Sequence, residues 1–318
     1  MHQATRRTGT ITRMKIAILG AGGVGGYYGG ALARAGHEVS LLARGAHLAA
    51  LREKGLEVRT PDETFQARVT ASDAAADFLG ADLALVTVKT YSLDEVAPAA
   101  RVLAEGGATI LPLLNGVEAV DRLAANGVPR GQLLGGLTEI SAARVAPGVV
   151  QRFSPFQRVA LGEISGDVSA RVTSIAEALR GAGVDVRIST DITADLWRKL
   201  AFIASMASAC GLARSPIGPI RETALGREVL ERAVEEVFAV ARARGLVLGP
   251  DETAKVMRFV DALGAELKPS LLRDLEAGAP TEIADLSGAV SRLGRLAGVD
   301  TPFHDTATAA LGISAPRA

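Results

Sequence analysis

Hydrophobic and polar positions follow two different patterns along the chain. Up to residue 188, short apolar runs alternate with segments of helical composition. Such alternation predicts a mostly parallel sheet with crossover helices. Beyond residue 188 the apolar positions recur at helical spacing alone, which predicts helices. The predicted strands are residues 15–19, 39–43, 83–88, 108–114, 132–137, 149–153, 159–161 and 184–188. The predicted helices that follow residue 188 are 191–213, 222–244, 251–266, 270–276 and 282–296.

A glycine-rich turn, GAGGVGG, joins the first apolar run to a helical segment. Its glycines have the spacing G-x-G-x-x-G, at Gly20, Gly22 and Gly25. The first allows a tight turn, the second lets the backbone approach a pyrophosphate, and the third lets helix and strand pack closely. We therefore expect this turn, with Gly23 and Val24, to bind a dinucleotide at the helix N-terminus. The alternative is a glycine-rich turn in another kind of α/β protein.

The residue after the second apolar run indicates which dinucleotide is bound. A site selective for NAD usually places Asp or Glu there, to accept from the ribose hydroxyls. This chain has Arg44 instead, with His47 one turn further on. A guanidinium can make two charge-assisted bonds to a 2′-phosphate, so the sequence favours NADP as the cofactor. The alternative is that Arg44 is a solvated loop charge.

Composition narrows the classes of partner and compartment. The 318 residues are enough for two domains, and 35 basic residues balance 35 acidic ones, so nothing suggests a nucleic-acid or membrane partner. The single cysteine, Cys210, excludes an internal disulfide and favours a reduced, cytoplasmic setting. The four histidines lack ligand spacing, so no metal is expected. Residues 1–13 lack a secretory core and are expected to be a disordered extension, with Met14 as an alternative start to Met1.

Five polar residues are candidates for the chemistry. Lys89 and Asn115 directly follow two of the predicted strands, where ligands bind in open α/β sheets. Lys199 begins an apolar helical run that could bury its stem and lower the pKa of its ammonium for acid catalysis. Ser270 and Glu282 lie near predicted helix starts. The alternatives are ordinary strand-end residues, a solvated helix lysine and helix caps.

Five sequence landmarks together resemble the 2-dehydropantoate 2-reductase (ketopantoate reductase) family. They occur in order from Lys15 to about Leu311, which is almost the whole chain. They are GAGGVGG at residues 20–26, VKTYS at 88–92, LNGVE at 114–118, LWRKL at 196–200 and SLLRDLEAGAPTEI at 270–283. The resemblance implies a Rossmann-type NADP-binding domain over residues 14–188 and a helical substrate domain over residues 189–318. It also implies reduction of a 2-oxo acid to a 2-hydroxy acid by NADPH, as in 2-dehydropantoate to pantoate in pantothenate biosynthesis.

The resemblance also implies roles for single residues. Lys199 aligns with the family's catalytic lysine, a general acid that protonates the carbonyl oxygen as hydride arrives. Glu282 aligns with a glutamate that engages the hydroxyl end of the substrate, and Ser270 with a serine that contacts it. Lys89 and Asn115 are similar to the lysine and asparagine that line the cofactor and substrate crevice.

Three departures from the family pattern concern the substrate. Where typical members have asparagine, this chain has Ile203, Ala207 and Ile217. Positions four and eight residues after Lys199 lie near its own helix face, so Ile203 and Ala207 are expected at the substrate. A wall without these amides predicts a 2-oxo acid with a more apolar tail than ketopantoate. The alternative is that the remaining contacts suffice and ketopantoate is the substrate.

Two other functions are compatible with the sequence. A non-catalytic NADP redox sensor needs the glycine turn and Arg44, although it has no use for Lys199. A β-hydroxyacid dehydrogenase has the same domain layout and a catalytic lysine, but the Trp-Arg-Lys and Thr-Glu-Ile patterns fit it less well. The sequence leaves the physiological direction open, and a homodimer is compatible with it.

Overall fold

The computed structural model describes residues 13–314, which form two compact units. The first unit contains the chain up to Val88, Val96–Leu113 and Asn126–Thr190. The second contains Lys89–Glu95, Leu114–Ala125 and the chain from Asp191 onward. The predicted division at residue 188 differs in that it leaves the two short segments in the first domain. The extension predicted for residues 1–13 falls, apart from Arg13, outside the described residues.

The first unit is built on a five-stranded parallel sheet with the order β5-β2-β1-β6-β7. Its central strand β1 (Lys15–Leu19) buries every residue after Lys15, as expected for an apolar strand with parallel neighbours on both sides. The other strands are β2 (Glu38–Leu42), β5 (Thr70–Ser72), β6 (Leu83–Val86) and β7 (Thr109–Pro112). The predicted parallel sheet is therefore confirmed.

Helix α1 (Gly23–Arg34) packs between this sheet and a second one. The second sheet has the order β4-β3-β10-β9. Cβ atoms added at Gly26 and Gly30 would lie 2.5 Å from side chains of Val150 and Val58 on that sheet, so the small residues of α1 permit close packing. The strands are β3 (Leu56–Arg59), β4 (Thr64–Ala67), β9 (Ala142–Ala146) and β10 (Val149–Arg152). A third sheet has the order β12-β11-β8, with β8 (Gly135–Glu139), β11 (Arg158–Gly162) and β12 (Asp185–Ile188).

The sequence also predicts that residues 149–153 and 159–161 pair antiparallel around Ser154 and Pro155, and this prediction is wrong. Strand β10 pairs antiparallel with β9 and parallel with β3, whereas β11 pairs with β8 and β12. The physical reason lies in the turn before β10, where Gly148 has a φ of +76°. This left-handed residue lets the chain reverse between β9 and β10, and the antiparallel partner of β10 therefore precedes it.

Several helices complete the first unit or connect the two. Helix α2 (Gly45–Lys54) follows β2, and α5 (Ala170–Gly181) packs on β12. Helix α3 (Leu93–Glu105) begins within a segment of the second unit and continues in the first. The short 3₁₀ helices η1 (Ala75–Phe78) and η3 (Arg130–Gln132) lie in the first unit, and η2 (Thr90–Ser92) lies in the second.

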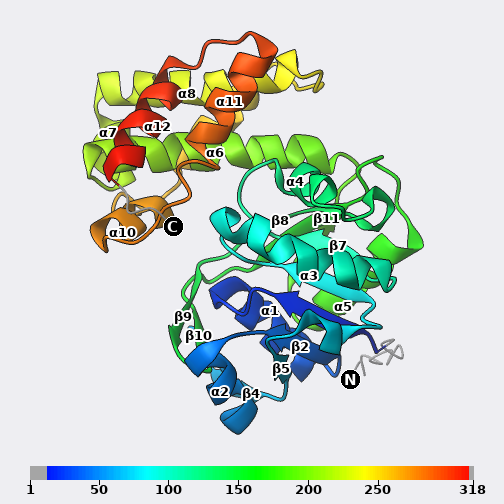
Figure 1. Cartoon of the computed structure of the whole chain (residues 1–318). Coiled ribbons are helices and arrows are strands. Elements are labelled where there is room, and N and C mark those ends of the chain that lie inside the picture. The colour runs from blue at the N-terminus through cyan, green and yellow to red at the C-terminus, as the bar shows by residue number, and fades with distance from the viewer. Residues whose placement is uncertain (1–12, 315–318) are drawn as a thin grey trace, which may run out of the picture. The chain divides into compact units, whose positions relative to one another are not determined.

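The second unit is helical, as predicted, and α6 (Ile192–Ala213) is its longest described helix (Figure 1). The Asp191 carboxylate caps α6 by accepting from the Ala194 amide. Figure 1 shows α8, α11 and α12 on one side of α6 and α10 on the other. The remaining helices are α4 (Ala119–Ala125), α7 (Ile217–Glu222), α8 (Ala224–Ala243), α9 (Glu252–Asp261), α10 (Ser270–Glu276), α11 (Ser287–Ala297) and α12 (Pro302–Ser314).

The helix predicted over residues 282–296 begins later, at Ser287, and Glu282 lies in the turn before it. The Glu282 carbonyl accepts there from the amides of Asp285 and Leu286. Helix α12 is absent from the predicted helices. Within residues 13–314, no helix has the length and apolar character needed to cross a membrane.

A buried polar chain connects four helices of the second unit. His304 on α12 is fully buried, and its Nε2 donates to the Ala233 carbonyl oxygen on α8. Its Nδ1 lies 2.8 Å from Ser287 Oγ on α11, which in turn lies 2.6 Å from Ser208 Oγ on α6. A carbonyl oxygen can only accept, so Nε2 carries the proton and Nδ1 accepts from Ser287. Burial lowers the pKa of His304 to about 4.

This shift makes the stability of the second unit depend on pH. The unfolded imidazole has a pKa near 6.5, above the folded value, so its contribution is complete above pH 6.5 and is lost as pH falls toward 4. We expect a loss of about 3 kcal/mol in unfolding free energy over that window. The measurement is urea unfolding followed by the fluorescence of Trp197, the sole tryptophan. His304→Gln does not titrate and should show a shallower pH dependence; equal slopes for the two proteins would contradict the assignment.

Candidate functional site

The glycine turn lies between β1 and α1, and its geometry explains its glycines. Gly20 has a φ of +114°, and an added Cβ would lie 2.7 Å from the Val88 amide nitrogen. A Cβ on Gly25 would lie 2.2 Å from the Gly20 carbonyl oxygen and 2.3 Å from Thr87 Oγ1. At Gly22 it would meet no atom within 4 Å, so the turn is open there. A turn that is closed on the sheet side and open at its second glycine fits a pyrophosphate at the start of α1.

The two basic residues after β2 have different surroundings. Arg44 is exposed and directly precedes α2, where a guanidinium is accessible to a ligand. His47 is buried, and its ring bonds to the backbone of Ala21 and Gly148. Of these two residues, Arg44 is therefore the exposed one.

Three of the predicted polar residues form a hydrogen-bonded chain within the second unit. Lys199 Nζ on α6 donates to Asn115 Oδ1 over 3.0 Å. Asn115 Nδ2 donates to Glu282 Oε2 over 3.3 Å. Because the ammonium only donates and the carboxylate only accepts, these partners determine which end of the amide faces each. The half-buried Lys199 thus has an oriented acceptor beside it.

The Glu282 carboxylate is the centre of this cluster. It is 5% exposed, and its Oε1 accepts from both the amide and the hydroxyl of Thr90, over 3.1 and 2.9 Å. Its Oε2 lies 3.4 Å from Lys89 Nζ. Burial would raise the pKa of Glu282, but Lys89 and the bonds from Thr90 and Asn115 outweigh it and lower the pKa. The group is therefore a buried anion at neutral pH.

Lys89 lies between two carboxylates. Its Nζ is 3.2 Å from Asp274 Oδ2 in addition to its contact with Glu282. Burial would lower the pKa of Lys89, but Glu282 and Asp274 together raise it. Asp274 lies on α10 one turn after the half-buried Ser270, so both residues share a helix face. Ser270 is thus on the side of α10 that meets Lys89.

The loop before α4 positions Asn115 through its glycine. Gly116 has a φ of +92°, and an added Cβ would lie 3.1 Å from the Asp285 carbonyl oxygen. Arg122 on α4 donates from Nη1 to Asp285 Oδ1 over 2.8 Å and therefore holds the turn that carries Glu282. The sequence Leu-Asn-Gly suits this loop because glycine follows Asn115 at the position where left-handed backbone is required.

Two members of the cluster were not among the predicted site residues. Thr90 supplies two donors to Glu282, and Asp274 pairs with Lys89. Both lie inside landmarks quoted above, Thr90 in VKTYS and Asp274 in SLLRDLE. Spacing offered one further signal, since Asp274 lies four residues after Ser270 on the same helix.

The three apolar replacements have different exposures. Ile203 is half-buried, one turn after Lys199 on α6. Ala207 is 3% exposed and Ile217 is fully buried, and both belong to the hydrophobic core of the second unit. Of the three, Ile203 is the one with side-chain surface available to a substrate.

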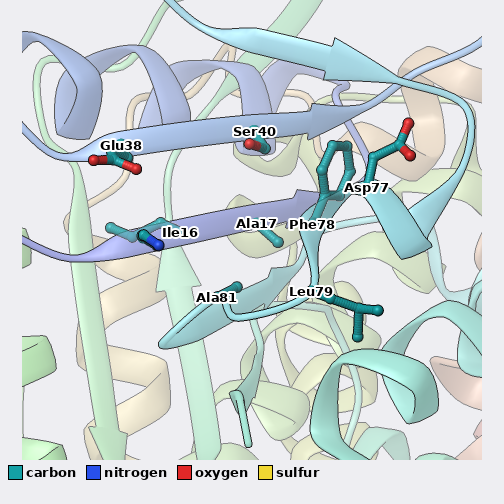
Figure 2. A pocket seen from close by; sticks show the side chains of 9 residues that line it. Ile16, Ala17, Glu38, Ser40, Asp77, Phe78, Leu79 and Ala81 are labelled. Carbon is teal, nitrogen blue, oxygen red and sulfur yellow. The ribbon is translucent and has the colours of Figure 1, made fainter. Parts of the chain in front are cut away.

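The first unit has a hollow at one end of β1 and β2 that none of these residues lines (Figure 2). Figure 2 shows Ile16 and Ala17 on β1, and Glu38 and Ser40 on β2. The complete lining is Lys15, Ile16, Ala17, Glu38, Ser40, Asp77, Phe78, Leu79 and Ala81. None of the predicted site residues lines it. Among residues 13–314, no group of three or more His, Cys, Asp or Glu side chains is arranged to hold a metal ion.

The chain is similar to known proteins over nearly its whole length. The chain is 36% identical over 283 residues to a 2-dehydropantoate 2-reductase of Halobacterium salinarum, covering 87% of this chain and 91% of that one. The crystal structure of a 2-dehydropantoate 2-reductase from Geobacter metallireducens matches with a TM-score of 0.85 and 31% identity, over 94% of this chain and 99% of that one.

A structure of D-mandelate dehydrogenase with NADH and anilino(oxo)acetate also matches, with a TM-score of 0.85 and 25% identity, over 95% of this chain and 98% of that one. Family models for ketopantoate reductase PanE/ApbA match residues 16–166, and for its C-terminal part residues 191–313. With the glycine turn and the lysine–asparagine–glutamate chain in place, the protein belongs to the ketopantoate reductase PanE/ApbA family of pyridine-nucleotide-dependent oxidoreductases.

Proposed function

We propose that this protein uses NADPH to reduce a 2-oxo acid to a 2-hydroxy acid, and that Lys199 is its general acid. The observation that carries the proposal is the bond from Lys199 Nζ to Asn115 Oδ1, with the same amide bonded to Glu282. The amide orients the ammonium, and the buried carboxylate orients the amide. A proton donor held in this way suits a reaction at one carbonyl oxygen.

The residues of the cluster divide the work of the reaction. The chemistry that NADPH would supply when bound is a hydride for the carbonyl carbon. Lys199 donates a proton from Nζ to the carbonyl oxygen, and its charge stabilises the alkoxide that develops there. The ammonium has three donor hydrogens, so its bond to Asn115 is compatible with a bond to the substrate. Glu282 orients the lysine through Asn115 and, in a substrate that carries a hydroxyl, binds that hydroxyl. Ser270 and Lys89 are assigned to binding.

Removal of the ammonium should slow reduction strongly and spare cofactor binding. Lys199→Ala is expected to lower kcat by about 10²- to 10⁴-fold, because general acid catalysis contributes that much. The dissociation constant for NADPH, measured by isothermal titration, should stay within about twofold of wild type, because Lys199 is assigned to the carbonyl oxygen of the substrate and not to the dinucleotide.

Lys268→Ala is the matched control, since this lysine pairs with Glu276 on the surface. An unchanged kcat in Lys199→Ala would contradict the role of the lysine. Absence of NADPH oxidation by wild type with every member of a carbonyl panel would instead favour the redox sensor.

Arg44 supports NADP as the preferred cofactor, because its guanidinium is exposed at the residue that precedes α2. The D-mandelate dehydrogenase structure contains NADH, so the preference of this protein for NADPH over NADH has to be measured. Arg44→Ala should raise the KM for NADPH by about tenfold or more, as expected for loss of a charge-assisted phosphate contact. The KM for NADH should change little, and Arg101→Ala, a surface arginine paired with Glu105, serves as control. Equal effects on both cofactors would contradict the assignment.

The half-buried Ile203 supports a 2-oxo acid with an apolar tail. Branched apolar 2-oxo acids should have a higher kcat/KM than ketopantoate in steady-state assays. Ile203→Asn should shift the ratio toward ketopantoate by about tenfold, since sites that hydrogen-bond a substrate hydroxyl discriminate strongly by it. Ile203→Val keeps the apolar wall and should keep the wild-type ratio. A clear preference of wild type for ketopantoate would overturn the apolar substrate and support a role in pantothenate biosynthesis. Cytoplasmic location and a homodimer stay predictions.

A further inference from the structure

His47 connects three segments of the first unit around the glycine turn. From the first turn of α2, its Nε2 bonds to the Ala21 carbonyl oxygen over 2.8 Å. Its Nδ1 accepts from the Gly148 amide, between β9 and β10, over 2.9 Å. His47 is 4% exposed, so bulk water does not compete for either ring nitrogen. Ala21 lies inside the glycine turn itself, between Gly20 and Gly22.

The two partners determine the protonation state of the ring. A backbone N–H only donates, so Nδ1 must carry a lone pair, and a carbonyl oxygen only accepts, so Nε2 must carry the hydrogen. The neutral Nε2–H tautomer satisfies both contacts. A second proton on Nδ1 would point at the Gly148 amide hydrogen and break that bond. Burial and the nearby Arg144 lower the pKa of His47, while the bond to Ala21 acts in the opposite direction.

The bond to Ala21 has a consequence for the next amide. In a trans peptide the C=O and the following N–H point in opposite directions. By holding the Ala21 oxygen, His47 therefore determines the direction of the Gly22 N–H. Gly22 is the residue at which the turn is open, and its own carbonyl accepts from the Gly26 amide as α1 begins. Both sides of Gly22 are thus oriented, one by His47 and the other by the helix.

We propose that His47 is a positioning residue for the dinucleotide site, which holds the Ala21–Gly22 peptide so that the Gly22 amide presents its N–H to the pyrophosphate. The inference rests on the assignment of the glycine turn as the cofactor site. It gives His47 a different task from Arg44, although the two residues lie only three positions apart. His47 acts on the ligand through the backbone.

The charged groups around His47 do not stabilise the protonated, positively charged form of its ring. Arg144 on β9 is the charged side chain that acts on the ring, and it opposes a second positive charge. Glu57 on β3 donates its amide to the Gly148 carbonyl, but its carboxylate is engaged by Arg59 and Gln66. Arg52 on α2 donates to the Ala71 carbonyl, and β5 and the first turn of α1 carry no acidic residue. With a proton on Nδ1, the ring N–H and the Gly148 N–H would face each other and repel, which would displace the ring from Ala21 as well. Acid should therefore weaken dinucleotide binding.

Two substitutions separate the bond to Ala21 from the bond to Gly148. The amide nitrogen of glutamine takes the place of Nε2, so His47→Gln keeps a donor for Ala21 and cannot titrate. The shorter asparagine places an acceptor where Nδ1 was, so His47→Asn keeps the bond to Gly148 and loses the bond to Ala21. His37→Asn is the matched control, because His37 is also buried and also accepts a backbone amide, that of Met14, before β1.

The experiment measures the dissociation constant of NADP⁺ by isothermal titration between pH 7.5 and 5.0. At pH 7.5, His47→Asn should bind about tenfold more weakly than wild type, while His47→Gln and His37→Asn stay within about twofold. Thermal unfolding of the four free proteins reports any general loss of stability. As pH falls below 6.5, His47 of wild type takes up a proton and glutamine does not, so the ratio of the wild-type constant to that of His47→Gln should rise. Titration of the ligand's own phosphate is equal in both proteins and cancels in this ratio.

Three results would overturn the proposal. They are wild-type affinity in His47→Asn, equal weakening in His47→Asn and His37→Asn, or a constant ratio of wild type to His47→Gln across the pH range. If wild type binds NAD⁺ in preference to NADP⁺, the Arg44 assignment fails, and the same comparison with NAD⁺ still decides the role of His47. Binding of neither dinucleotide to wild type would overturn both.

Discussion

The buried carboxylate of Glu282 is the constraint on which the polar site of the second unit depends. A carboxylate that is 5% exposed is costly unless donors surround it. Here the donors are the Thr90 amide and hydroxyl, the Asn115 amide and the Lys89 ammonium. Together with Glu282, these donors come from three separate segments of the chain, so satisfying one anion assembles the site. Lys199 joins it through Asn115.

In the first unit, too, buried polar side chains have hydrogen-bond partners, but those partners are backbone carbonyl groups of the glycine turn. The glycine turn has few side chains to restrict its peptide planes, so their direction must come from neighbouring groups. Thr87 donates to the Gly20 carbonyl, and His47 holds the Ala21 carbonyl. A backbone turn ordered in this way can bind a pyrophosphate with little loss of conformational entropy. In the second unit, donor side chains surround one buried carboxylate. In the first unit, side chains orient the peptide groups of a backbone turn.

The family assignment limits the chemistry, and the three apolar positions on α6 and α7 that the sequence singled out differ in their burial. Ala207 and Ile217 are packed in the core of the second unit, so replacing asparagine there changes packing. Ile203 keeps part of its surface and lies one turn from Lys199. The apolar-substrate hypothesis now depends on this residue, where the sequence alone weighted all three equally. Buried alanine and isoleucine have little means of recognising a ligand directly.

The sequence by itself determined the features that local pattern encodes. The apolar runs predict the parallel sheet, the helical spacing predicts the second unit, and the glycine spacing predicts the turn that opens α1. The order of the landmarks was enough to identify the family. Each of these depends on residues close together in the chain, where backbone geometry and periodicity are direct physical signals.

Only the tertiary structure decided which distant residues meet. Thr90 and Glu282 are 192 positions apart, His47 and Gly148 are 101 apart, and neither bond has a local signature. The pairing of β10 with β9 and β3 followed from the turn at Gly148 and not from the runs of apolar residues alone. Thr90 and His47 look like ordinary polar residues in the sequence. Their roles arise because burial forces every polar group to find a partner, and the fold chooses which one.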